Sequence, residues 1–77
     1  MGIVNTKVIS DAYLAGETVD LASLRARGLI PSDVGRIKIL AVGTLDKPLT
    51  VKADAFSLQA VKMITLTVGQ AIELKEP

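Results

Sequence analysis

The clearest pattern in the chain is a strict alternation of apolar and polar side chains over Leu49–Ala55. Apolar residues occupy the odd positions of this segment and polar residues the even ones. A period of two is typical of a β-strand that buries one face. Arg36–Val42 alternates in a similar way, because Ile37 and Ile39 share one face while Lys38 points away from it. The pattern therefore predicts strands over both segments.

Capping signals and apolar spacing predict two helices. Asp20 is a favourable N-cap residue, because its carboxylate can accept hydrogen bonds from the free amides of a first helical turn. Gly28 suits the left-handed position that follows a helix, so we predict a helix over residues 21–27. Ser57 is predicted to cap a second helix. The buried stripe of that helix is expected to comprise Leu58, Val61, and Met63 or Ile64.

Three further segments favour extended structure: Ile3–Ile9, Thr18–Val19 and Gln70–Leu74. Ile64–Val68 is ambiguous, because it continues the second helix but is rich in β-branched residues that lose rotamer freedom there. In isolation it reads as a strand. The main order is strand, helix, strand, strand, helix, strand, which predicts a single mixed α+β domain over residues 1–77.

A faint internal echo accompanies this order. Thr18-Val19 precedes the first predicted helix and Thr50-Val51 precedes the second, from position 18 to position 50, a spacing of 32 residues. A period of this length is typical of one supersecondary unit, so an internal repeat is one interpretation. With only two copies, chance agreement is the favoured one.

Composition excludes several classes of chemistry. The 77 residues include no histidine and no cysteine, so a Ser-His-Asp triad, a Cys-His pair, a disulfide and a Cys or His zinc site are impossible. No two carboxylates stand out by spacing, and the six glycines do not form a phosphate-binding loop. We therefore predict no enzymatic activity and no cofactor. Because 49% of residues are apolar with one Phe and one Tyr, the core must be aliphatic.

The charge balance argues against a strongly basic nucleic-acid binder, because nine basic and eight acidic residues give a net charge of +1. One cluster is nevertheless a candidate. Arg36, Lys38 and Lys52 share the polar parity of the two alternating strands, and Lys47 lies at their rim. If these strands are neighbours, the charges would share one face and could meet phosphates. The alternative is a solvated outer face.

No segment of the sequence favours a membrane. No apolar run approaches the roughly 20 residues that span a bilayer. The opening residues also lack a charged region followed by an apolar core, which a secretory signal requires. We therefore expect no membrane partner.

The central stretch resembles a known family. The residues that carry the resemblance are Ile-Lys-Ile-Leu at 37–40, Gly-Thr-Leu-Asp-Lys-Pro-Leu-Thr-Val-Lys-Ala at 43–53, and Phe-Ser at 56–57 with Ala60. Their types and spacing are similar to the C-terminal domain of bacterial large-subunit ribosomal protein fifteen. The resemblance extends over roughly Val4–Leu74.

This resemblance implies a small superhelical domain of irregular β-β-α turns. It also implies a structural, non-catalytic role in the large ribosomal subunit of the cytoplasm, in contact with ribosomal RNA and neighbouring ribosomal proteins. Four matched polar positions would then face RNA, and Arg36 occupies a less constrained place beside them. The four positions are Lys38, Lys47, Lys52 and Ser57.

Departures from the family pattern leave a second hypothesis open. The family's long arm rich in Gly, Arg and Lys has no counterpart here, so we expect weak RNA binding, and Asp54 stands where the family is often basic or neutral. The second hypothesis is an isolated, reconstructed or engineered domain of this fold that self-associates as an interaction module. Its homo-oligomeric contact would be an apolar edge at Ile64–Val68 or Ile72–Leu74.

Overall fold

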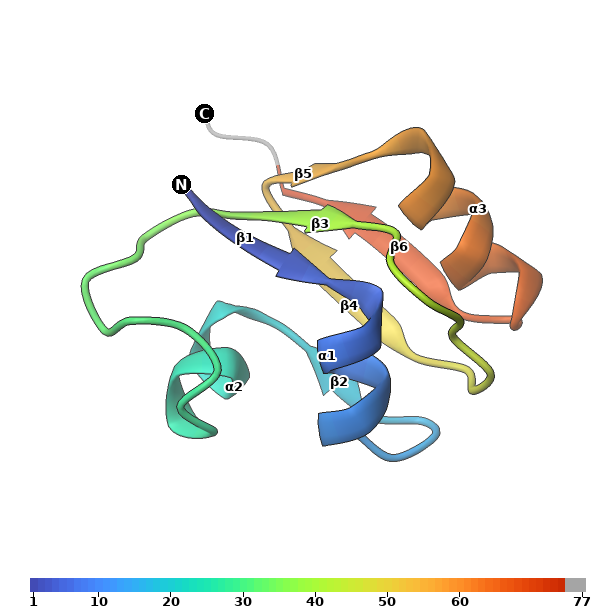
Figure 1. Ribbon diagram of the computed structural model, residues 1–77, viewed down its shortest axis with the longest axis horizontal. Helices are drawn as coiled ribbons and strands as arrows, with labels where there is room; N and C mark the ends of the chain where they lie inside the picture. Colours follow the sequence, from blue (N-terminus) through green and yellow to red (C-terminus); the bar gives the residue numbers. More distant parts are fainter. Residues whose placement is uncertain (75–77) are drawn as a thin grey trace.

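The computed structural model describes residues 1–74, and its chain makes three successive turns around one core (Figure 1). Each turn contributes one strand to each of two parallel sheets. The first sheet has the order β1 (Gly2–Asn5), β3 (Ile37–Leu40), β5 (Ala55–Phe56), and the second has the order β2 (Thr18–Val19), β4 (Thr50–Ala53), β6 (Gln70–Glu73). Parallel neighbours require crossover connections, which explains why the chain winds as a superhelix.

Three helices lie in these crossovers. Helix α1 (Thr6–Ala12) joins β1 to β2, α2 (Leu21–Ala26) follows β2, and α3 (Leu58–Leu66) joins β5 to β6. Figure 1 shows α3 at the opposite end of the molecule from α2. The middle turn has a loop over residues 41–49 in place of a helix. The predicted mixed α+β class of a small domain is confirmed.

The core is almost entirely aliphatic, as the composition requires. The inward faces of both sheets and one face of each helix contribute to it, and Tyr13 is its one aromatic side chain among the fully buried residues. The buried residues of the core are Val4, Ile9, Tyr13, Val19, Leu24, Ile30, Ile37, Ile39, Leu45, Leu49, Val51, Ala53, Ala60 and Ile64.

The predicted first strand, Ile3–Ile9, is wrong in its second half. The strand ends at Asn5, whose side chain accepts a hydrogen bond from the amide of Val8 at 2.9 Å and caps α1. Thr6 is fully buried, and its hydroxyl bonds both the amide and the carbonyl of Val42. The polar residues Asn5 and Thr6, which interrupt the apolar run, therefore begin a helix.

The predicted strand Leu49–Ala55 is also wrong as one element, because it divides at Asp54. Residues before Asp54 form β4 in the second sheet, and residues after it form β5 in the first sheet. Asp54 turns the chain between the sheets by bonding both backbone groups of Ile37: its amide donates to the carbonyl at 3.1 Å, and its carboxylate accepts from the amide at 2.9 Å.

The first predicted helix is confirmed with its caps. Asp20 accepts from the amide of Ser23 at 2.7 Å, and the Ser23 hydroxyl accepts from the amide of Asp20 at 3.0 Å. This reciprocal pair satisfies two donors that a helix start leaves free. Gly28 is left-handed with φ of 68°, and the amide of Leu29 returns to the carbonyl of Leu24.

The second predicted helix is correct in its cap and wrong in part of its buried face. The Ser57 hydroxyl accepts from the amide of Ala60 at 3.1 Å. Ala60 and Ile64 are buried, whereas Leu58 is 70% exposed. The ambiguous segment Ile64–Val68 is not a strand, since α3 continues to Leu66. That segment therefore offers no strand edge for self-association, whereas Ile72 does lie on an edge strand, β6.

The two similar Thr-Val pairs lie side by side in the structure. Thr18 pairs in register with Thr50, and Val19 with Val51, as adjacent parallel strands of the second sheet. Gln70 and Ala71 continue the same two rows on β6. The 32-residue spacing is thus the length of chain between adjacent strands.

Candidate nucleic-acid interface

Lys38 and Lys52 lie on the outer faces of two different sheets. β3 pairs with β1 and β5, whereas β4 pairs with β2 and β6, so the two alternating strands are not neighbours. The inward-facing residues of β3 and β4 belong to the common core, and Lys38 and Lys52 alternate with them along the two strands. The two strands would have to be neighbours for their charges to share one basic face, and they are not. Lys38 and Lys52 therefore belong to the surfaces of different sheets.

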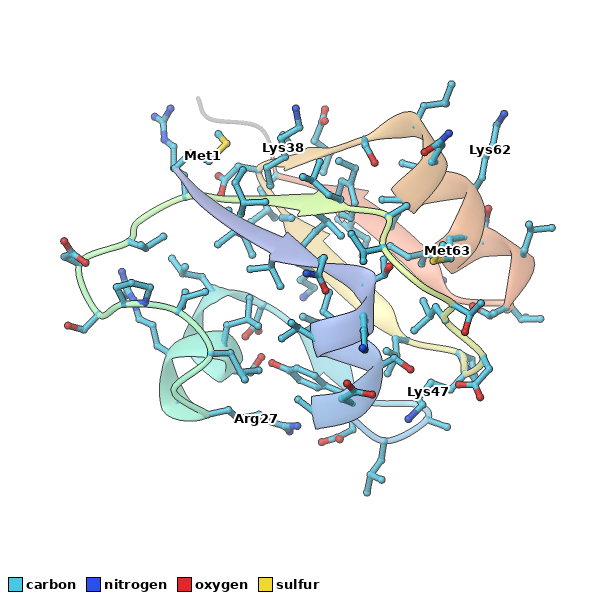
Figure 2. All side chains as sticks on the ribbon, in the orientation of Figure 1. Met1, Arg27, Lys38, Lys47, Lys62 and Met63 are labelled. Carbon is cyan, nitrogen blue, oxygen red and sulfur yellow. The ribbon has the colours of Figure 1, made fainter. Side chains whose placement is uncertain are left out.

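Each of these lysines has an apolar cross-strand neighbour. Lys38 is in register with Ile3 on one side and Ala55 on the other, and Figure 2 shows its side chain pointing away from the body of the protein. Lys52 is in register with Ile72. Both are half-buried, and neither ammonium group makes a hydrogen bond or ion pair within residues 1–74. Their stems cover apolar surface while the charges stay in water.

Arg36 lies just before β3, on the same parity as Lys38. It is exposed, and its carbonyl accepts a hydrogen bond from the amide of Gly2 at 2.8 Å. That bond extends the pairing of β3 with β1 and fixes the backbone at this position. Arg36 and Lys38 therefore leave the first sheet close together, two residues apart.

Lys47 and Ser57 are both engaged inside the molecule. The Lys47 ammonium donates to the carbonyls of Ser10 at 2.7 Å and Tyr13 at 3.0 Å, at the C-terminal end of α1. A cation stabilises this end of a helix because the last carbonyls lack partners there. Ser57 caps α3 through its bond from Ala60. As RNA contacts, both residues remain predictions.

The structure adds two exposed lysines that the alternation of the strands did not identify. Lys7 lies on α1 with its stem beside Gly43. Lys62 lies on the outer side of α3. Neither has an internal counter-charge among the residues that the structure describes. Helical spacing from the buried Ala60 and Ile64 would have placed Lys62 on the outside.

Arg27, in contrast, makes its contacts within the protein. Its guanidinium pairs with the Glu17 carboxylate at 2.7 Å and stacks 3.9 Å from the centre of the Tyr13 ring. The hydrogen bond from Arg27, with a second from the amide of Leu14, lowers the pKa of Glu17 below its ordinary value. The same bond raises the pKa of Arg27. The positive charge of Arg27 is therefore already paired with the carboxylate of Glu17.

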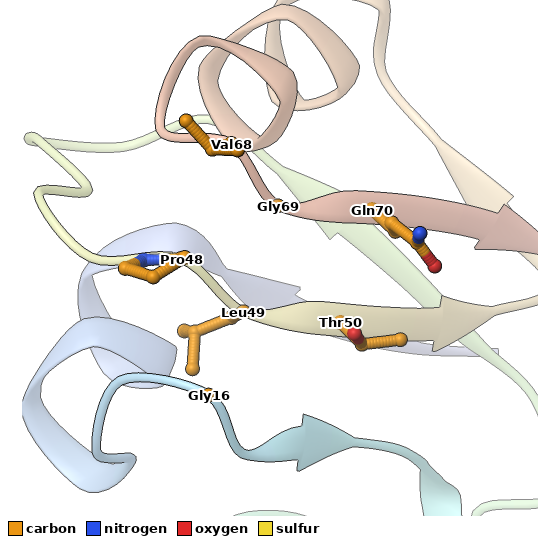
Figure 3. Close-up of a pocket in the computed structure, with 7 residues that line it drawn as sticks. All are labelled: Gly16, Pro48, Leu49, Thr50, Val68, Gly69 and Gln70. Carbon is orange, nitrogen blue, oxygen red and sulfur yellow. The ribbon is translucent and has the colours of Figure 1, made fainter.

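An open groove of about 250 Å³ crosses the beginnings of β2, β4 and β6 (Figure 3). Three turn segments far apart in the sequence line it, which is why no local pattern predicted it. Its lining residues are Gly16, Pro48, Leu49, Thr50, Val68, Gly69 and Gln70. Thr50 and Gln70 lie opposite each other in register, and their side chains make no internal hydrogen bond within residues 1–74.

Residues 1–74 contain neither a cluster of metal ligands nor a membrane-spanning helix. Within them, no group of three or more carboxylates could hold a metal ion. No helix in this part of the chain is both long enough and apolar enough to cross a bilayer. The lysines and the groove are therefore the surface features that remain to be explained.

Comparison with known proteins decides the family. The sequence model of ribosomal proteins 50S-L15, 50S-L18e and 60S-L27a matches residues 3–72. The chain belongs to this family. Among its relatives, a large ribosomal subunit protein uL15 from Syntrophotalea carbinolica is 42% identical over 69 residues, which are 90% of this chain and 47% of the relative. The uL15 protein of Thermotoga petrophila is 44% identical over the same shares of the two chains.

The chain spans about half the length of these uL15 relatives. A further relative, the uL15 protein of Geotalea uraniireducens, is 43% identical over 63 residues, or 82% of this chain and 42% of the relative. The resemblance to ribosomal protein fifteen in the sequence is therefore confirmed. For this member of the family, Lys38, Lys52 and the groove lie within the matched residues 3–72.

Proposed function

We propose that this chain is a structural, non-catalytic component of the large ribosomal subunit that binds ribosomal RNA through phosphate contacts. The observation that carries the proposal is the family match over residues 3–72, whose relatives are named as proteins of that subunit. The proposal includes neighbouring ribosomal proteins as partners, the cytoplasmic ribosome as location, and residues 1–77 as one folded domain.

The cations without an internal counter-charge support phosphate binding. Lys38 and Lys52 have no ion pair or hydrogen bond within the described residues, so binding to a phosphate would break no existing contact. Arg36 is included in the proposed interface only because it lies two residues before Lys38. Because these charges lie on two sheets, they fit two separate segments of a folded RNA better than one continuous strand.

The test is salt-dependent binding to ribosomal RNA. The double variant Lys38→Ala/Lys52→Ala should bind more weakly, and the slope of log affinity against log salt should fall by about two, because each phosphate contact contributes about 0.9. Lys7→Ala/Lys62→Ala is the matched control, since it removes the same charge from two helices. Equal losses in both double variants would show that net charge, and not this pair, determines binding. No binding by the unchanged protein would contradict the proposal.

One observation favours self-association as a second candidate. Five of the large apolar side chains that are exposed lie on the last turn of the superhelix: Leu58, Leu66, Val68, Ile72 and Leu74. Exposed apolar surface is typical of a contact face where it forms one patch, and within the described residues β6 lies at the edge of its sheet. Light scattering across a range of concentrations tests it, and a monomer at the highest concentration would exclude this candidate.

A further inference from the structure

A row of uncharged polar side chains crosses the second sheet beside the groove. Thr18, Thr50 and Gln70 are in register on the three adjacent strands. The hydroxyl groups and the amide have no internal hydrogen-bond partner within residues 1–74. Together they offer donors and acceptors at the surface, because a hydroxyl group and a primary amide each provide both.

The groove next to this row is lined by both polar and apolar residues, and two of them are glycines. Figure 3 shows Pro48 on the segment that enters the central strand β4, between Val68 and Gly69 on the segment that enters β6 and Gly16 on the segment that enters β2. Its volume of about 250 Å³ is below the roughly 300–1,000 Å³ of pockets that enclose drug-sized molecules. The space therefore suits one group that is smaller than a drug-sized molecule.

The charges around the groove also restrict its occupant. None of the lining residues is charged, so the groove itself does not select an ion. Lys52 lies two residues beyond Thr50 on the same face of β4, about 6.6 Å away along the strand. The carboxylate of Glu17, next to Gly16 in the chain, is matched by Arg27 at 2.7 Å. The combination is a neutral groove with one available cation nearby.

We propose that the groove receives the base of one unpaired nucleotide of an RNA, with Lys52 at the phosphate of the same segment. Thr50 and Gln70 would bond the edge of the base, and the side chains of Pro48 and Val68 would contact its ring. Unpaired bases of RNA are recognised by hydrogen bonds to their edges. This inference rests on the proposed RNA binding and adds a ligand and a site to it.

The experiment compares two RNA hairpins that differ at one position. One has a fully paired stem, and the other carries a single unpaired 2-aminopurine, whose fluorescence rises when the base leaves the stack. We expect the unchanged protein to bind the second hairpin about tenfold more tightly, because a tenfold change corresponds to about 1.4 kcal/mol, which one or two net hydrogen bonds can supply. Fluorescence should increase on binding.

The variant Thr50→Val/Gln70→Ala should lose this preference while still binding the paired hairpin with the same salt dependence. Thr44→Val/Gln59→Ala is the matched control, because both residues are exposed and lie outside the groove. Gln70→Ala alone should lose part of the preference, which provides a second variant if the double one is unstable.

The outcomes separate this inference from the proposed function. A preference that is absent in the unchanged protein, or that survives in Thr50→Val/Gln70→Ala, would overturn the base site and leave phosphate binding intact. Failure to bind either hairpin or ribosomal RNA would instead contradict the proposed function. Loss of the preference in the control variant as well would also overturn the assignment of the site to Thr50 and Gln70.

Discussion

Replacing Lys47 with methionine distinguishes a role in the fold from a role in RNA binding. The ammonium group donates to the carbonyls of Ser10 and Tyr13 and thereby joins the loop before β4 to the end of α1. Methionine keeps an unbranched apolar stem but removes the charge and both hydrogen bonds. We therefore expect Lys47→Met to destabilise the protein.

The magnitude follows from these contacts. A hydrogen bond that involves a charged group contributes about 1.5–3 kcal/mol, but Lys47 is only half-buried, so water can replace part of what is lost. The expected decrease in the free energy of unfolding is about 1–2 kcal/mol. That is a large part of the roughly 4–12 kcal/mol expected for a domain of this length. With a urea dependence near 1 kcal/mol per molar, the unfolding midpoint should fall by about 1–2 M.

The assay is urea unfolding followed by circular dichroism, with RNA binding measured where all variants are folded. Lys62→Met is the matched control, because Lys62 is exposed without a partner in the described residues, and its stability should change by less than about 0.5 kcal/mol. RNA affinity should be similar for both variants. If Lys47→Met unfolds like its control but binds RNA as weakly as Lys38→Ala/Lys52→Ala, the structural account of Lys47 is refuted.

Two further predictions concern backbone packing and pH. Gly69→Ala should lower the free energy of unfolding by about 2 kcal/mol or more, because a Cβ there would collide with the carbonyl oxygen of Leu49. Gly35→Ala is the control, because no atom lies within 4 Å of the place where its Cβ would be. Its free energy of unfolding should be nearly unchanged in the same urea experiment. The lowered pKa of Glu17 should stabilise the fold above the ordinary value of 4.5, and this contribution should disappear as the pH falls below it. Thermal melts over that acidic range should show a smaller acid-induced decrease for Glu17→Gln, and equal decreases would mean that the pair with Arg27 adds nothing.

Local signals in the sequence predicted the elements whose boundaries depend on neighbouring residues. The helix from Leu21 was predictable because Asp20 and Gly28 mark its ends through bonds and dihedral angles within a few residues. The cap at Ser57 was predictable for the same reason. The strand predicted through Ile9 was wrong because Asn5 was interpreted as an interruption, although its cap is also a local signal.

The candidate site was less predictable, because its parts come from separate turns of the superhelix. The sequence shows that Lys38, Lys47 and Lys52 are cations, but it does not show which of them has an internal partner. Lys47 lies 34 positions from Tyr13 along the chain and still bonds its carbonyl. The groove beside Thr50 combines three turns in the same way.

The sequence by itself determined the mixed class of the fold, its aliphatic core, the absence of histidine and cysteine chemistry, and the family. Only the tertiary structure decided that the alternating segment divides at Asp54 between two sheets, and that Lys38 and Lys52 therefore belong to different faces. The physical reason is that alternation reports which side of a strand is buried and nothing about its neighbours. Pairing depends on the crossovers and on bonds such as that between Asp54 and Ile37, which join distant parts of the chain.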